Sequence, residues 1–104
     1  MHTYTDSCPV CAQDYEAWIV NGIEDLVQLG EERPNYLLGE IRKHGAVAAT
    51  RSIVGKTHPS EGFIRLLMNG YKDRTLEACV LDNGLPCPLF DFDLQQTAKL
   101  RLGR

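Results

Sequence analysis

Residues 44–81 constrain the fold of this chain most, because three short apolar-patterned runs follow one another there. Gly55, the pair Asn69-Gly70 and the turn cluster Asp82-Asn83-Gly84 close them in succession. An isolated helix of this length is marginal in water, so no run can bury its apolar face alone. We therefore predict that the three runs form the middle of one shared helical core.

The chain is long enough for one domain, with 104 residues of which 43% are hydrophobic. Residues 13–30 carry apolar side chains at steps of three and four, which predicts an amphipathic helix packed on a core formed by residues 36–102. Residues 1–12, which contain the motif Cys8-Pro9-Val10-Cys11, are predicted to be a turn or loop. Since no stretch alternates like a strand, we expect a single all-α domain at 1–104, a compact bundle of five or six short helices.

Capping residues predict where several helices begin and end. Gly45 can adopt the left-handed conformation between two helices. Ser60, Asp73 or Thr75, and Asp91 are expected N-caps. The helix after Ser60 is predicted to bury the stripe Phe63, Ile64, Leu67 and Met68, and the last helix Leu94, Ala98 and Leu102.

No apolar run approaches the roughly 18–20 residues that a membrane-spanning helix needs. The first residues carry neither a basic nor an apolar region typical of a secretory signal. These features predict a cytoplasmic protein whose four cysteines stay reduced and do not form two disulfides.

Charge is unevenly distributed along the chain. Residues 1–52 carry eight acidic and four basic residues, a net charge of −4, whereas residues 53–104 carry six and seven, a net charge of +1. An acidic half does not favour contact with phosphates. It either keeps the chain soluble or suits a protein partner with basic residues. The predicted partner surface is the outer face of helix 13–30 with the Cys8–Cys11 loop, and its candidate residues are Glu24, Asp25, Glu31 and Glu32.

Several motifs after residue 43 occur in a fixed order. They are His44-Gly45-Ala46-Val47, Pro59-Ser60-Glu61-Gly62-Phe63, Thr75-Leu76-Glu77-Ala78 and Pro88-Leu89-Phe90. In this the chain resembles a group of short bacterial helical proteins and C-terminal segments, over roughly 60 of its 104 residues. The resemblance implies a helical fold and a cytoplasmic bacterial setting, but no catalytic residue, because that group has no established activity. Cys79, where an aliphatic residue is usual, and the longer connection carrying Cys87 depart from the pattern.

Cysteine spacing is the sharpest chemical signal. A Cys-x2-Cys pair places two thiolates on one metal, and zinc takes four ligands, so Cys8, Cys11, Cys79 and Cys87 are a candidate zinc site. The alternative without a metal is that Cys79 is a small core residue and that the other three cysteines are ordinary thiols. Cys8 and Cys11 could also be a redox pair, although no strand-helix unit supports one. A cysteine nucleophile would need a histidine beside it, and nothing in the sequence places one there.

Two helices joined by a turn within 40–70 invite comparison with a DNA-binding helix-turn-helix. The second helix, however, offers few polar side chains to bases. The alternative function is a zinc-stabilised nucleic-acid-binding module. It would use a modest cluster of basic residues near this helix, Arg42, Lys43, Arg51 and Lys56. The function that we favour is non-enzymatic. We expect a small intracellular regulator or inhibitor that binds another protein, encoded by a phage or mobile element and directed, for example, against a bacterial defence system.

Overall fold

The computed structural model describes residues 9–86 and 88–104, with side chains from Val10 onward. Within this described part the elements are α1 (Pro9–Gln28), α2 (Asn35–His44), α3 (Ala46–Val54), α4 (Glu61–Met68), the short 3-10 turn η1 (Lys72–Arg74), α5 (Leu76–Asp82) and α6 (Phe92–Leu102). These six α-helices, with no strand in the described residues, confirm the predicted all-α bundle. None of the described helices is long and apolar enough to span a membrane.

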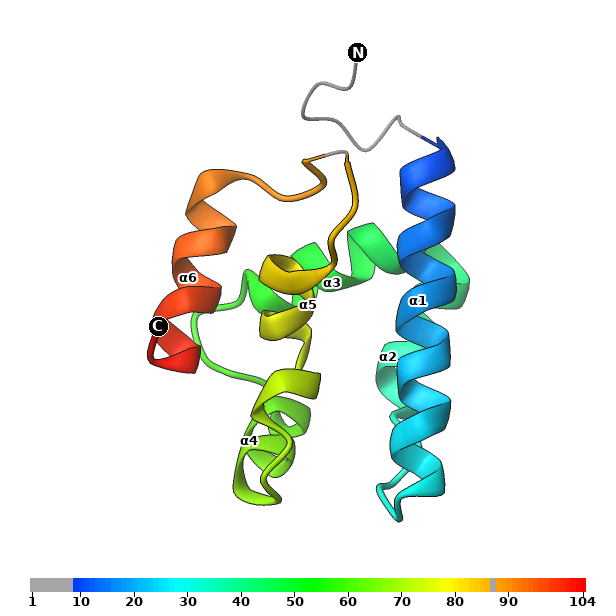
Figure 1. The fold of residues 1–104 in the computed structure, drawn as a ribbon, viewed down its shortest axis with the longest axis vertical. Helices are drawn as coiled ribbons and strands as arrows, with labels where there is room; N and C mark the ends of the chain where they lie inside the picture. The colour runs from blue at the N-terminus through cyan, green and yellow to red at the C-terminus, as the bar shows by residue number, and fades with distance from the viewer. Residues whose placement is uncertain (1–8, 87) are drawn as a thin grey trace.

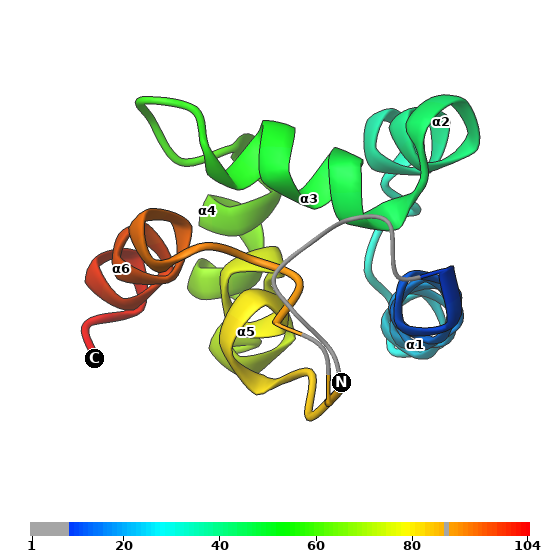
Figure 2. The same ribbon diagram turned by 90° about the horizontal axis from the view of Figure 1, so that it is seen from above.

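Helix α3 is the centre of the fold and is in contact with α1, α2, α5 and α6. Six of its nine residues are buried, and three of these are small enough to let neighbouring helices approach closely: Ala46, Ala49 and Thr50. Helices α1 and α2 lie on one side of α3, whereas α4, α5 and α6 lie on the other, as Figures 1 and 2 show. The molecule therefore has two arms, and α3 connects them.

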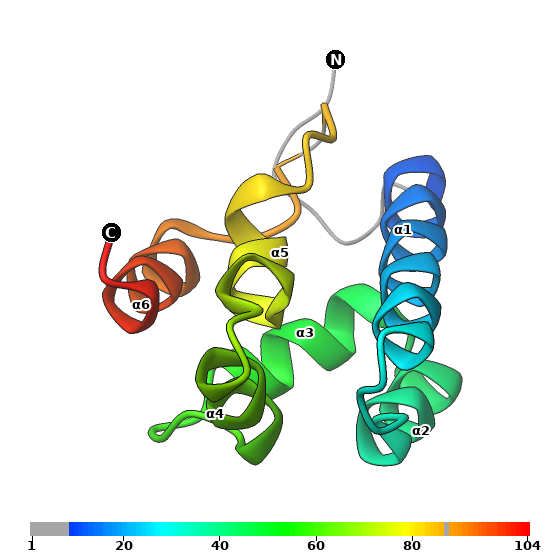
Figure 3. The same cartoon turned by 60° about the horizontal axis from the view of Figure 1, so that its bottom comes forward.

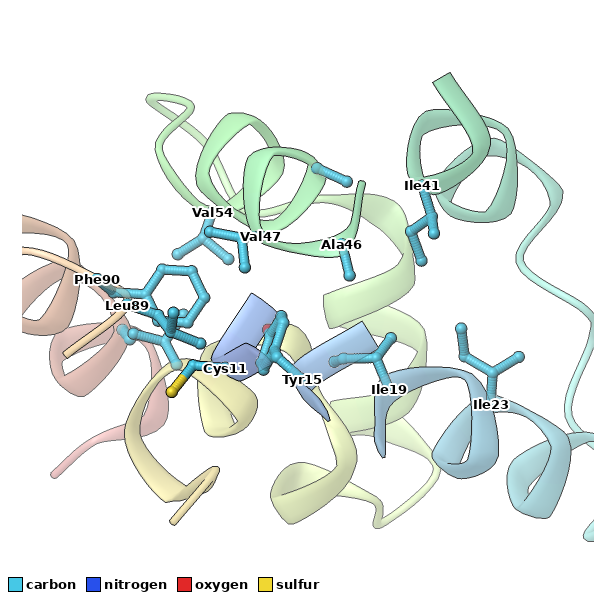
Figure 4. Close-up of a cluster of buried hydrophobic side chains, with 13 residues drawn as sticks. Cys11, Tyr15, Ile19, Ile23, Ile41, Ala46, Val47, Val54, Leu89 and Phe90 are labelled. Atoms are coloured by element: carbon cyan, nitrogen blue, oxygen red, sulfur yellow. The ribbon is translucent and has the colours of Figure 1, made fainter. Parts of the chain in front are cut away.

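One buried cluster joins the N-terminal arm to the centre (Figure 4). Tyr15 and Ile19 of α1 point toward Ala46 and Val47 of α3, and Ile23 lies opposite Ile41 of α2. Leu89 and Phe90 complete the cluster from the segment before α6. The predicted packing of the N-terminal helix on the core is therefore confirmed. Cys11 lies in the same cluster with an exposed fraction of 2%.

The N-terminal lead differs from the prediction, because α1 begins at Pro9 and not at residue 13. Proline favours the first helical position, where its missing N–H has no intrahelical partner to lose and its φ already suits a helix. Residues 9–11, the last three of the Cys8–Cys11 motif, are therefore in the first turn of α1 and not in a loop. Cys8 lies outside the described residues.

The predicted caps are present where the side chains reach the next turn. The Phe63 amide donates to Ser60 Oγ at 3.1 Å, the Ala78 amide to Thr75 Oγ1 at 3.2 Å, and the Leu94 amide to Asp91 Oδ1 at 2.8 Å. Thr75 is thus the cap of α5, while Asp73 lies in η1.

The predicted buried stripe of α4 is largely wrong. Phe63 is buried, but Ile64, Leu67 and Met68 are exposed. The stripe of α6 is closer to the prediction, since Ala98 and Leu102 are buried and Leu94 packs half-buried against the core. Helix α4 is strongly amphipathic, but its apolar face extends beyond the side that the other helices cover, so part of that face stays exposed.

Gly45 alone separates α2 from α3, at φ 87° and ψ 160°. Only glycine adopts this region readily, and the sharp turn allows Glu16 Oε1 of α1 to accept the Ala46 amide at 3.0 Å. We expect Gly45→Ala to destabilise the fold by about 1–3 kcal/mol, measured by urea unfolding. Gly39→Ala in the middle of α2 should instead be neutral or stabilising, because its φ is ordinary and its Cβ would meet no atom within 4 Å. Equal losses in both variants would contradict this role for Gly45.

Candidate functional site

A groove of about 1290 Å³ lies between the two arms of the molecule. One wall is α1 with the segment 31–37, and the opposite wall is formed by α4, η1 and α5. Figures 1 and 3 show how α1 stands apart from α4 and α5 while α3 connects them at the back. The groove therefore follows from α1 packing on α3 without closing onto the second arm.

The α1 wall combines part of the buried stripe of this helix with a more exposed stripe beside it. The buried stripe is Tyr15, Ile19, Ile23 and Leu26, and its last three members also line the groove. Next to it, Trp18, Gly22 and Asp25 recur at steps of four and three and line the groove. Gly22 has no side chain, and a Cβ built there would meet no atom within 4 Å, so the wall is hollowed at this position.

The interior of the groove is apolar. Its opposite wall presents Phe63 and Leu66 of α4 and Leu76 of α5, and Ile53 contributes from α3. Two aromatic side chains are exposed on the α1–α2 side: Trp18, with an exposed fraction of 43%, and Tyr36, with 63%. The Lys56 ammonium lies 5.3 Å from the centre of the Tyr36 ring, a cation–π contact.

Three polar contacts cross the mouth of the groove at the C-terminal end of α1. Arg65 of α4 pairs with Glu32. Asn69 Nδ2 donates to Glu31 Oε2 at 3.0 Å, and an Arg74 nitrogen of η1 lies 4.0 Å from an Asp25 carboxylate oxygen. The acidic groups all belong to the α1 side and their partners all belong to the α4–η1 side.

The predicted partner residues therefore come together at this mouth. Asp25, Glu31 and Glu32 line the groove. Glu24 pairs instead with Arg33 on the same wall, and the hydrogen bond from Arg33 lowers the pKa of the Glu24 carboxyl. The sequence reading missed the groove partners Arg65, Asn69 and Arg74.

Those three partners carry no local sequence signal. They lie 33 to 49 residues from the groups that they contact, and only the packing of the arms brings them near.

Comparison with protein-family models, curated proteins and solved structures finds no match. The resemblance of residues 44–102 to short bacterial helical proteins therefore stays a prediction.

The zinc prediction falls partly outside the described residues, because Cys8 and Cys87 are not described. Within the described residues no three His, Cys, Asp or Glu side chains gather as metal ligands would. Cys11 is disulfide-bonded, which differs from the expectation that the thiols are reduced. That expectation came from the cellular compartment and not from geometry. A zinc site that includes Cys11 requires the reduced form, since zinc binds the thiolate, and so it stays a prediction.

Cys79 carries the free thiol of the described residues and lines the groove from α5. Burial, together with the negative charges of Asp82 and Glu77, raises the pKa of this thiol to about 12. A thiol must ionise to act as a nucleophile, so Cys79 is held in its unreactive form at neutral pH. Cys79 also packs against the core cluster, which supports its interpretation as a packing residue.

Of the four basic residues predicted to bind nucleic acid, only some are available to contact a phosphate. Arg42 and Lys43 are exposed in the last turn of α2. Arg51 is half-buried and donates to the Leu89 carbonyl at 2.7 Å, which ties α3 to the segment before α6. Lys56 lies over Tyr36. Nucleic-acid binding through all four residues stays a prediction.

Proposed function

We propose that this chain is a non-enzymatic binding protein that holds an amphipathic helix of a partner protein in the groove, and so regulates or inhibits that partner. The observation that carries the proposal is the groove itself, with its apolar interior and its polar mouth. In this reading the protein acts in the cytoplasm of a bacterium, as the product of a phage or mobile element.

The size of the groove favours a peptide segment over a small molecule. Pockets for small ligands measure roughly 300–1,000 Å³ and are mostly enclosed, whereas this groove is larger at about 1290 Å³. An amphipathic helix can lay its apolar face into such a groove and keep its polar face in water. The α1 wall runs from Trp18 to Leu26, about 12 Å at the rise of an α-helix, which matches a little over two helical turns.

Gly22→Leu tests the groove directly. The leucine should fill the hollow in the α1 wall and weaken binding of the captured partner protein at least tenfold. The fold should gain about 0.5–1 kcal/mol, because glycine is the poorer helix former. The measurements are affinity capture from the host with mass spectrometry, followed by titration of the identified partner against the variant, with thermal unfolding alongside.

Gly39→Leu is the matched control. Gly39 is also helical with open space around its Cβ position, but it lies in α2 and does not line the groove. This variant should keep the partner. Retention of the partner by both variants would contradict the groove as the binding site. Capture of nucleic acid in place of protein, lost when Arg42 and Lys43 are changed to Glu, would favour the alternative function.

A further inference from the structure

We infer that the partner helix carries opposite charges on its two flanks, basic toward α1 and acidic toward α4, and that these charges set the direction in which it lies. This inference rests on the proposed function and describes its occupant.

The two lips of the groove differ in charge. On the α1 side, no described residue of the same wall is a basic partner for Asp25, Glu31 or Glu32, because Arg33 pairs with Glu24. On the other side, Arg65 and Arg74 point across the mouth. Asp73, also on that side, pairs with Arg104 at 3.4 Å, so its charge is compensated within the arm. The other acidic residues that line this side are Glu61, one turn before Arg65, and Glu77 of α5, which pairs with Arg101.

The contacts across the mouth are weak enough for a ligand to replace. The Arg65 and Glu32 side chains are 50% and 78% exposed, and exposed ion pairs contribute roughly 0–1 kcal/mol. The main helix packing of α1 is with α3 and not with α4. The mouth can therefore open by side-chain rotation without unpacking a core.

Opening the mouth leaves a net negative charge on the α1 lip, from Asp25, Glu31 and Glu32, and a net positive charge on the other, where Arg65 and Arg74 outnumber Glu61. A helix with lysines on one flank and glutamates on the other restores both sets of pairs at once. A helix with two basic flanks restores one set and repels Arg65 and Arg74, while a helix with two acidic flanks repels Asp25, Glu31 and Glu32. Charge complementarity of this kind fixes the orientation of a bound partner more than it raises affinity.

Three synthetic peptides of 14 residues test the inference. All share one leucine face, and their flanks carry lysine and glutamate, lysine alone, or glutamate alone. Trp18 is the single tryptophan of the chain and lines the groove, so its fluorescence reports binding without a label. We expect the mixed-flank peptide to bind several-fold more tightly than either other peptide at low salt. The difference should shrink at high salt, because screening weakens exposed pairs.

A charge-matched pair of variants locates the effect. Arg65→Gln with Arg74→Gln should weaken the mixed-flank peptide several-fold and strengthen the lysine-only peptide. Arg42→Gln with Lys43→Gln removes the same charge from the end of α2 and should change neither affinity. Equal binding of the three peptides would overturn the inference about charge, but it would still support the groove as the binding site of an apolar helix face. No change in Trp18 fluorescence with any peptide would overturn the proposed function as well.

Discussion

Arg101→Ala is expected to destabilise the protein by about 3–5 kcal/mol, the usual cost of leaving a buried charge without its partner. The Arg101 and Glu77 side chains are 10% and 3% exposed, and their nitrogen and oxygen lie 3.1 Å apart. Arg101 also donates to the carbonyls of Val54, at 2.8 Å, and Lys56. One guanidinium thus joins α6 to α5 and to the end of α3, and its loss is large against a typical total stability of roughly 5–15 kcal/mol.

The pH dependence of this loss identifies its cause. Burial raises the pKa of the Glu77 carboxyl, although the hydrogen bond and charge of Arg101 lower it. Without Arg101 this pKa should rise further, so Glu77 takes up a proton in the folded variant as the pH falls. The loss should therefore be largest near neutral pH and smaller near pH 4. Urea unfolding of both proteins at the two pH values measures it.

Arg104→Ala is the control for this prediction. Arg104 pairs with Asp82 at 2.9 Å, but both side chains are well exposed, so the loss should be at most about 1 kcal/mol. The double change Glu77→Leu with Arg101→Met should recover much of the stability, because a packed apolar pair can replace a buried ion pair. A similar loss for Arg101→Ala and Arg104→Ala would show that Glu77 does not depend on Arg101.

Tyr15→Ala is expected to cost about 3–5 kcal/mol, as for other large buried aromatic residues. Tyr15 is fully buried, and its ring meets Phe90 edge-on with centroids 5.3 Å apart. It lies where α1, α3 and the segment before α6 meet, so its removal leaves a cavity shared by all three (Figure 4). Thermal unfolding followed by helical circular dichroism measures the effect.

Tyr15→Phe separates packing from hydrogen bonding. The Thr50 hydroxyl donates to the Ala46 carbonyl at 2.8 Å, so the Tyr15 hydroxyl donates to Thr50 Oγ1 at 2.9 Å. Phenylalanine keeps the ring and loses this one bond, at a cost of about 0.5–1.5 kcal/mol. If Tyr15→Phe proved as damaging as Tyr15→Ala, the hydrogen bond and not the ring would dominate.

The acidic residues of the groove could be predicted from the sequence, but their partners could not. Acidity and their place on or just after the first helix selected Glu24, Asp25, Glu31 and Glu32 as candidate contact residues. The structure places the last three at one mouth, whereas Glu24 pairs with Arg33. Their partners Arg65 and Arg74 could not be found in this way, because any of the basic residues could have faced them. The same holds for Glu77 and Arg101, which are 24 residues apart.

Local sequence patterns were enough to predict most of the helices and several of their ends. Ser60, Thr75 and Asp91 cap helices through contacts three residues away, and Gly45 turns the chain within a single residue. Such interactions are local, so their pattern is visible in the chain. How much of the apolar face of α4 is covered, and that α1 stops short of the second arm, could be seen only in the folded structure. Those outcomes depend on how the volumes of distant side chains fit around α3, and the groove is the space that this fit leaves open.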